Sequence, residues 1–221
     1  STITITFTII FNNLAGINTG TVPPFLFNLA GITVWNYFTA CLMGTSNTFG
    51  ANAGIFGKVY FPRIIVPISI VISNLLKFGI QFGIFIAFYV FYYFQGAAIS
   101  LNGLVVFFPI LIIVMGILGL GLGMFISSLV TKYRDFSHLI GFGVQLLMYV
   151  SAVVYPMALV KEKMPEYAWL VQYNPLAYII ETTRYMLLNV GHISFWGLGY
   201  TFVATVLIFL VGVLIFNRTE K

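Results

Sequence analysis

The segment GIFGKVYFPR, residues 54 to 63, decides how the rest of this 221-residue chain is arranged. No Asp, Glu, Lys or Arg occurs from Ser1 to Gly57, so Lys58 and Arg63 are the first charges in the sequence. Long apolar runs lie on both sides. A short basic and aromatic segment between two membrane-length runs is typical of a cytoplasmic turn. It fits either a loop that only fixes orientation or a handle bound by a partner protein.

The composition indicates an integral membrane protein. Hydrophobic residues make up 60% of the chain and charged residues 7%, with a mean hydropathy of +1.03. So few polar residues cannot cover a soluble globule. The net charge of +5 comes from bases near the ends of apolar runs, so we expect no nucleic-acid partner. Because Ser1 follows no initiator Met and no signal peptide is visible, we expect the chain to be a fragment.

Apolar runs near the length of about 20 residues that a membrane helix requires predict an all-α fold with six spans. We predict that residues 1–221 form one transmembrane domain with both ends in the cytoplasm. The predicted spans are residues 1–11 (a truncated first span), 25–47, 64–94, 103–130, 136–155 and 197–216. Lys132, Arg134 and Asp135 mark a second cytoplasmic turn.

Residues 164–190 predict an external re-entrant helical hairpin, since neither of its two short helices can cross a bilayer. Asn174 and Pro175 are typical of a helix cap and first turn. Glu181 and Arg184, three residues apart, would share a helix face and pair with each other or across a twofold axis. If the two residues pair, replacing either one with Ala should impair the protein's activity, and exchanging the two should restore part of it. An ordinary solvated pair is the alternative.

Residues for catalysis are missing from the sequence. It holds no paired carboxylates, no nucleophile beside a base and no metal-ligand cluster, so we expect no enzyme activity, metal or cofactor in this chain. It also lacks a phosphate-binding Gly-rich loop ending in Lys-Ser/Thr. We therefore expect energy to come from another subunit.

Four motifs in order resemble those of a known family. They are KVYFPR at 58–63 with Pro67 after it, KYRD at 132–135, VYP at 154–156 and NPLAYIIETTR at 174–184. Together they resemble the permease subunit of type-2 ABC exporters, in the branch that exports O-antigen, capsule and teichoic-acid polysaccharides. The resemblance covers nearly the whole chain. The amphipathic helix that precedes the first span in that family has no counterpart in this sequence, as expected of a fragment.

The resemblance implies a permease in the bacterial cytoplasmic (inner) membrane, paired with a second copy of itself. Two copies of a separate P-loop ATPase would bind ATP and Mg, and an undecaprenyl-linked glycan would be the substrate. It also implies a coupling helix at 54–63, seated on the ATPase, and external gate helices at 164–189. The coupling residues would be Gly54, Lys58, Tyr60, Phe61, Pro62 and Arg63, and the gate residues Asn174, Pro175, Glu181 and Arg184.

Aromatic side chains are the expected lining of a sugar path, because the C–H faces of sugar rings stack on them. Among 39 aromatic residues, Tyr37, Tyr149 and Tyr155 are the candidates, with lipid-facing positions as the alternative. Lys77, roughly 20 Å along its helix, is either a functional charge or a side chain that extends to a polar cavity. The family commonly has an acidic residue where Lys77 stands.

Other functions remain open at this stage. An ABC exporter of a drug or lipid, an ion-coupled or passive channel, and a membrane assembly factor without transport activity all fit a polytopic chain. An ion-coupled carrier would be expected to place carboxylates at the membrane midplane, where this sequence has only Lys77.

Overall fold

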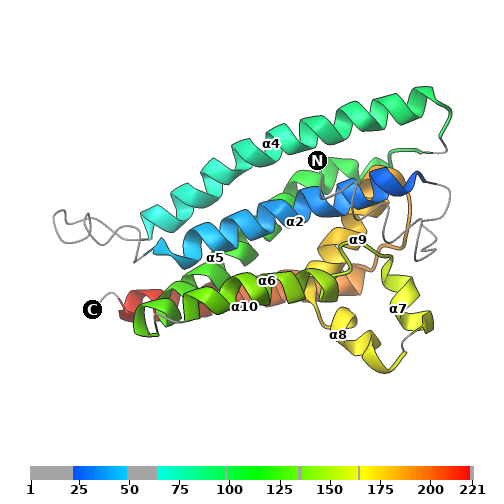
Figure 1. Ribbon diagram of the computed structural model, residues 1–221. Helices are drawn as coiled ribbons and strands as arrows, with labels where there is room; N and C mark the ends of the chain where they lie inside the picture. The colour runs from blue at the N-terminus through cyan, green and yellow to red at the C-terminus, as the bar shows by residue number, and fades with distance from the viewer. Residues whose placement is uncertain (1–21, 49–63, 98, 134–135, 164, 220–221) are drawn as a thin grey trace.

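The computed structural model describes residues 22–48, 64–97, 99–133, 136–163 and 165–219 (Figure 1). Within these ranges the chain is helical and contains no strand, which confirms the predicted all-α class. The α-helices are α2 (Pro24–Ser46), α4 (Ile65–Phe94), α5 (Phe108–Lys132), α6 (Phe136–Val150), α7 (Met157–Lys163), α8 (Ala168–Gln172), α9 (Pro175–Leu188) and α10 (Phe195–Thr219). Two 3-10 helices, η2 (Gly103–Phe107) and η3 (Pro165–Tyr167), precede α5 and α8.

Among the described residues, four helical stretches are long and apolar enough to cross a membrane. They are Pro24–Ser46, Ile65–Phe94, Gly103–Lys132 and Phe195–Arg218. Each lies within a few residues of a predicted span. The predicted first span, 1–11, and the predicted coupling segment, 54–63, lie outside the described residues.

The predicted fifth span, 136–155, is helical only as far as Val150. At a rise of about 1.5 Å per residue, the 15 residues of α6 cover about 22 Å, less than the roughly 30 Å of a bilayer core. Beyond Val150 the chain leaves the helix, and Ala152 adopts a left-handed backbone with φ of 53°. The count of six spans stays a prediction.

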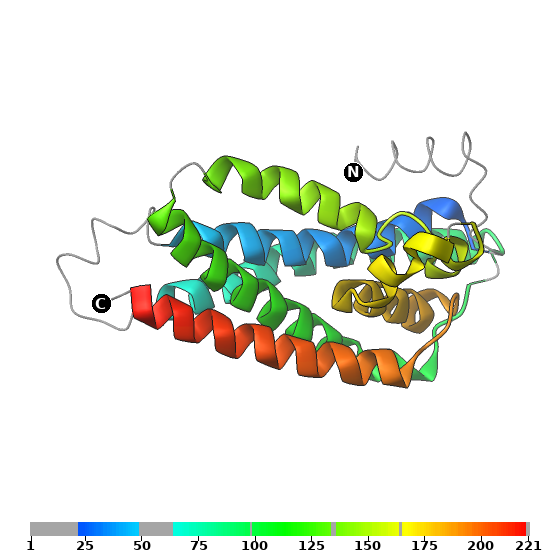
Figure 2. The same cartoon turned by 90° about the horizontal axis from the view of Figure 1, so that it is seen from below.

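Helix α2 is the centre of the bundle, with α4 and α5 packed on it and α10 packed on α5 (Figures 1 and 2). Glycines on α5 allow these close contacts. A Cβ on Gly119 would lie 2.9 Å from Cβ of Cys41 on α2, and one on Gly121 would lie 2.7 Å from Cα of Phe209 on α10. Small residues have this effect where helices meet inside a membrane.

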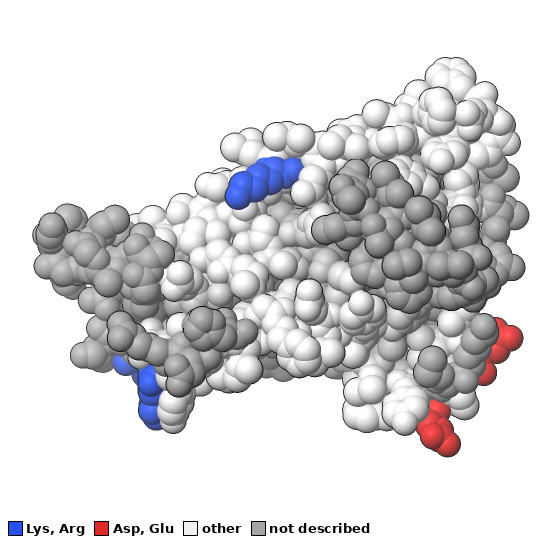
Figure 3. Space-filling view, in the orientation of Figure 1, with Lys and Arg blue, Asp and Glu red and all other residues white. Residues whose placement is uncertain are grey.

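The two ends of the bundle differ. The helices α2, α4, α5, α6 and α10 run along its length, whereas α7, α8 and α9 gather at one end, which we call the α9 end (Figure 1). In Figure 3, acidic atoms lie at the α9 end, whereas one group of basic atoms lies at the opposite end and another lies along the side of the bundle. Lys132 ends α5 at that opposite end. By the positive-inside tendency, the Lys132 end is the predicted cytoplasmic one.

Short helices form at the α9 end where the sequence predicts a re-entrant hairpin, and the hairpin itself stays a prediction. Asn174 caps α9 and Pro175 is its first residue, as the sequence predicts. Asn189 ends α9 with φ of 55°, and Gly191 follows with φ of 93°. Helix α9 lies between α2 and α10 (Figure 2). Helix α7 was not predicted from the sequence, and the re-entrant depth of the hairpin stays a prediction.

Candidate functional site

Arg184, near the middle of α9, is fully buried, with 0% of its surface exposed. Its guanidinium donates hydrogen bonds to four backbone carbonyls. Nη1 donates to Ala152 (2.9 Å) and Tyr155 (3.2 Å), Nη2 donates to Val153, and Nε reaches Phe27 at 3.4 Å. A guanidinium can serve all of these acceptors because its donors form a rigid planar fork.

The acceptors come from two elements distant in sequence. Three of them lie just beyond the end of α6, where unpaired carbonyls and the helix dipole favour a cation. The fourth belongs to Phe27 on α2, whose ring also lies 3.8 Å from Cζ of Arg184. Arg184 therefore joins α9 to α2 and to the segment after α6.

Glu181, one turn earlier on α9, pairs with Arg184 inside the same chain. Its Oε2 lies 3.9 Å from Nη1 of Arg184, and 11% of its side chain is exposed. The two residues thus share a helix face as predicted, but burial excludes the alternative of an ordinary solvated pair. A role for the pair in gating stays a prediction.

Arg184 remains charged at neutral pH despite its burial. Burial lowers its pKa to about 10, while the nearby Glu181 and Tyr155 act in the opposite direction. That pKa is still far above 7, so the protein holds a permanent cation among carbonyl oxygens.

Asn174 forms a second link between α9 and the end of α6. Its side-chain oxygen accepts from the backbone N–H of Leu176 (3.0 Å), and its side-chain nitrogen donates to Oγ of Ser151 (2.9 Å). Asn174 is buried. One residue therefore satisfies a free N–H of the helix start and fixes the segment before Ala152.

The remaining links hold α9 at its two ends. At its C-terminal end, Asn102 donates to the side chain of Asn189 (3.2 Å), which in turn donates to Ser100 (3.2 Å). At its start, Thr201 of α10 donates to the carbonyl of Pro175 (3.3 Å). Helix α9 is thus bonded to α2, α10, the segment after α6 and the turn before η2, so its displacement would disturb all of them.

The predicted path residues lie in different surroundings. Tyr37 is buried among α2, α4 and α5, with its ring 5.3 Å from Phe78. Tyr149, by contrast, is 46% exposed on α6, and the hydroxyl of Tyr155 donates to the Tyr149 carbonyl. Lys77 is exposed on α4. The structure does not bring these four side chains together, and their roles stay predictions.

The predicted cytoplasmic sites are mostly outside the described residues. These include every proposed coupling residue, namely Gly54, Lys58, Tyr60, Phe61, Pro62 and Arg63, together with Arg134 and Asp135 of the second turn. Lys132 is exposed, and its ammonium lies 5.5 Å from the ring centre of Tyr133.

Comparison with known proteins decides the family. A model of the ABC-2 type transporter family matches residues 1–188. The chain belongs to the ABC-2 type transporter family. This membership and the four long apolar helices make it a multi-pass membrane protein. The resemblance stated from the motifs is thereby confirmed.

Relatives of this ABC-2 chain include two proteins of Klebsiella pneumoniae named O-antigen export system permease protein RfbA. Each is 28% identical over 195 residues, which cover 88% of this chain and 72% of the relative. A protein of the same name from Myxococcus xanthus is 22% identical over 143 residues, covering 64% of this chain and 53% of its own length.

Several residues that hold α9 in place could not be predicted from the sequence. Phe27 and Gly31 belong to an apolar run and carry no pattern that distinguishes them from lipid-facing or packed neighbours. Asn102 immediately precedes the predicted span 103–130, and Asn189 is the last residue of the predicted gate helices. Two Asn residues at the ends of predicted elements could have suggested a cap-to-cap bond, but nothing in the sequence pairs them.

Proposed function

We propose that this chain is the permease subunit of an ATP-driven exporter of a lipid-linked polysaccharide of the O-antigen type. The observation that carries the proposal is the 28% identity, over 88% of the chain, to permeases named for O-antigen export. Family membership supports transport, and the missing phosphate-binding loop supports a separate ATPase.

In the proposed complex, two copies of the chain pair with two copies of a P-loop ATPase in the bacterial inner membrane. ATP and Mg bind to the ATPase, and this chain supplies the membrane path. The segment 54–63 contacts the ATPase, and α9 with its neighbours closes the path on the external side. The rigid attachment of α9 through Arg184 supports this role, since a gate must return to one closed position.

The test is transport into inverted membrane vesicles prepared from the native bacterium. Lipid-linked glycan made on the outer face of these vesicles should become resistant to an added glycosidase when ATP is supplied. Deleting the permease, or replacing the phosphate-binding Lys of the ATPase, should abolish this protection, whereas a protonophore should leave it intact.

Other results would favour the competing functions. Protection that survives inactivation of the ATPase and disappears with the protonophore would indicate an ion-coupled carrier. Failure of ATP to protect any glycan, with ATPase activity stimulated by a drug or lipid, would favour an exporter of that other substrate.

A further inference from the structure

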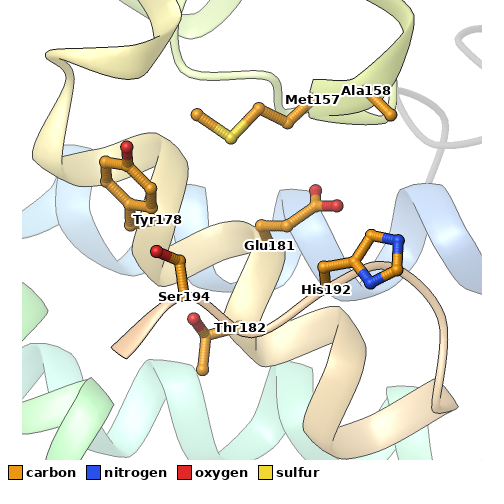
Figure 4. Close-up of a pocket in the computed structure, with 7 residues that line it drawn as sticks. All are labelled: Met157, Ala158, Tyr178, Glu181, Thr182, His192 and Ser194. Atoms are coloured by element: carbon orange, nitrogen blue, oxygen red, sulfur yellow. The ribbon is translucent and has the colours of Figure 1, made fainter. Parts of the chain in front are cut away.

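A pocket with both apolar and polar walls, called the polar pocket below for its hydrogen-bonding groups, lies at the α9 end of the bundle. Its volume is about 260 Å³, and three separate elements line it (Figure 4). Helix α7, helix α9 and the segment before α10 contribute Met157, Ala158, Tyr178, Glu181, Thr182, His192 and Ser194. Glu181 both lines this pocket and pairs with Arg184. The other lining residues are separate from the carbonyls that Arg184 binds.

Two other pockets among the described residues have nearly the same volume, about 270 Å³, but a different lining. One is lined only by apolar residues of α5 and α10: Leu122, Phe125, Leu207, Ile208 and Val211. The other, between α5 and α6, is almost as apolar. Acyl chains suit such grooves, whereas the pocket at the α9 end, whose mostly apolar lining includes several polar groups, suits a ligand that combines apolar contact with hydrogen bonds.

The polar groups of the pocket are placed for a ligand with several hydroxyls. The carboxylate of Glu181 and the imidazole of His192 point into the space below Met157 and Ala158 (Figure 4). The carboxylate accepts hydrogen bonds, and the hydroxyls of Tyr178 and Thr182 both donate and accept. Met157 and Ala158 present apolar atoms from α7 and suit a C–H face.

Electrostatics favour a neutral ligand. Arg184, with Nη1 3.9 Å from Oε2 of Glu181, offsets the charge of the single carboxylate and so weakens attraction for an amine. Among the lining residues that the structure describes, none is a Lys or Arg that could bind a phosphate. A divalent metal is disfavoured because no group of three potential His, Cys, Asp or Glu ligands occurs in the part of the chain that the structure describes.

We propose that this pocket binds one neutral sugar ring of the exported glycan at the external end of the path. The proposal rests on the proposed function for its substrate and adds a place where that substrate is recognised. The pocket is smaller than the roughly 300–1,000 Å³ typical of small-molecule sites, so it suits one ring rather than an oligosaccharide.

Saturation-transfer NMR on the complete permease–ATPase complex in lipid nanodiscs tests the site. The probes are methyl α-glycosides of glucose, galactose, mannose and rhamnose, with glucosamine and glucuronate as charged comparisons. We expect binding of at least one neutral glycoside in preference to either charged sugar. Thr182→Val should weaken that binding about fivefold, the effect of losing a single neutral hydrogen bond.

Thr183→Val is the matched control, because Thr183 is the next residue of the same helix. Its hydroxyl donates to the carbonyl of Ile179 within α9, and it does not line the pocket. Equal weakening by both variants, unchanged binding in Thr182→Val, or stronger binding of glucuronate than of every neutral glycoside would overturn the proposal.

The glycosidase-protection assay on the same complex separates this inference from the proposed function. Absence of ATP-dependent glycan protection in the unmodified complex would refute the proposed function. Normal protection together with no sugar binding that depends on Thr182 would refute only the pocket.

Discussion

Gly31 on α2 leaves the space that the guanidinium of Arg184 occupies. A Cβ on Gly31 would lie 2.6 Å from Nη2 of Arg184 and 2.6 Å from the carbonyl oxygen of Val153. Real Cβ atoms do not approach other atoms this closely. Neither neighbour can move freely, because the guanidinium is bonded to that carbonyl and to the carbonyl of Ala152.

Gly31→Ala should therefore destabilise the protein by about 1–3 kcal/mol, the usual cost of overpacking. We expect a lower midpoint of thermal denaturation in detergent micelles. Gly199→Ala on α10 is the control, because no atom lies within 4 Å of the Cβ that it would add. The control should be neutral or slightly stabilising, since Ala is the better helix former. An equal effect of both changes would contradict the steric explanation.

Arg184→Ala should cost about 3–5 kcal/mol, because it leaves Glu181 and several buried carbonyls without their cation. Arg184→Lys should recover only part of this loss, since an ammonium cannot reproduce the planar fork. Permease abundance and thermal denaturation measure the loss. Full stability of the Lys variant would show that charge alone is sufficient.

Exchange of Glu181 and Arg184 should not restore stability or export. The sequence-based expectation of partial restoration is revised, because the exchange would place a carboxylate against the carbonyl oxygens of Ala152, Val153 and Tyr155. The negative carboxylate would repel these partly negative carbonyl oxygens, and no donor would remain to form hydrogen bonds with the carbonyls. The measurement is glycan export scored beside permease abundance in both single variants and in the exchange. Recovery in the exchange would favour a simple ion pair.

Asn174→Ala should destabilise α9 by about 1–2 kcal/mol through loss of its cap. Part of that loss should be shared with Ser151→Ala, because the two side chains are bonded at 2.9 Å. A double-mutant cycle by thermal denaturation measures the shared part. Strictly additive effects would show that the bond between them contributes nothing.

Tyr60→Ala combined with Phe61→Ala should abolish stimulation of the ATPase by the permease and leave membrane insertion intact. The reason is that aromatic side chains commonly anchor such interfaces, with Lys58 and Arg63 adding salt-sensitive attraction. Tyr167→Ala, at the α9 end and 58% exposed, is the control and should leave stimulation unchanged. Unchanged stimulation in the double variant would remove the coupling hypothesis.

Cysteine labelling in the transporting complex should distinguish the predicted path residues. Tyr149→Cys, at a position 46% exposed, should react with a membrane-impermeant maleimide if α6 faces the path, whereas Tyr37→Cys, at a position 3% exposed, should be protected. The native Cys41 is itself buried and should not react. An unlabelled Tyr149→Cys would count against a path along α6.

The sequence alone determined the four long helices and several of the helix limits. Apolar length predicts the long helices, because a bilayer allows few other structures for such runs. The cap of α9 is equally local. Asn174 precedes Pro175, and Asn189 and Gly191 supply the left-handed residues at the other end. Each of these signals depends on neighbouring residues or on the bilayer, and so can be predicted from sequence.

Only the tertiary structure decided what Arg184 binds. The spacing of Glu181 and Arg184 predicts their contact, since both belong to one helix. The carbonyls of Phe27 and Ala152 carry no sequence signal, because every residue has a carbonyl, and folding alone brings these to the guanidinium from 157 and 32 residues away. The polar pocket could not be predicted for the same reason, because folding alone brings together its walls from α7, α9 and the segment before α10.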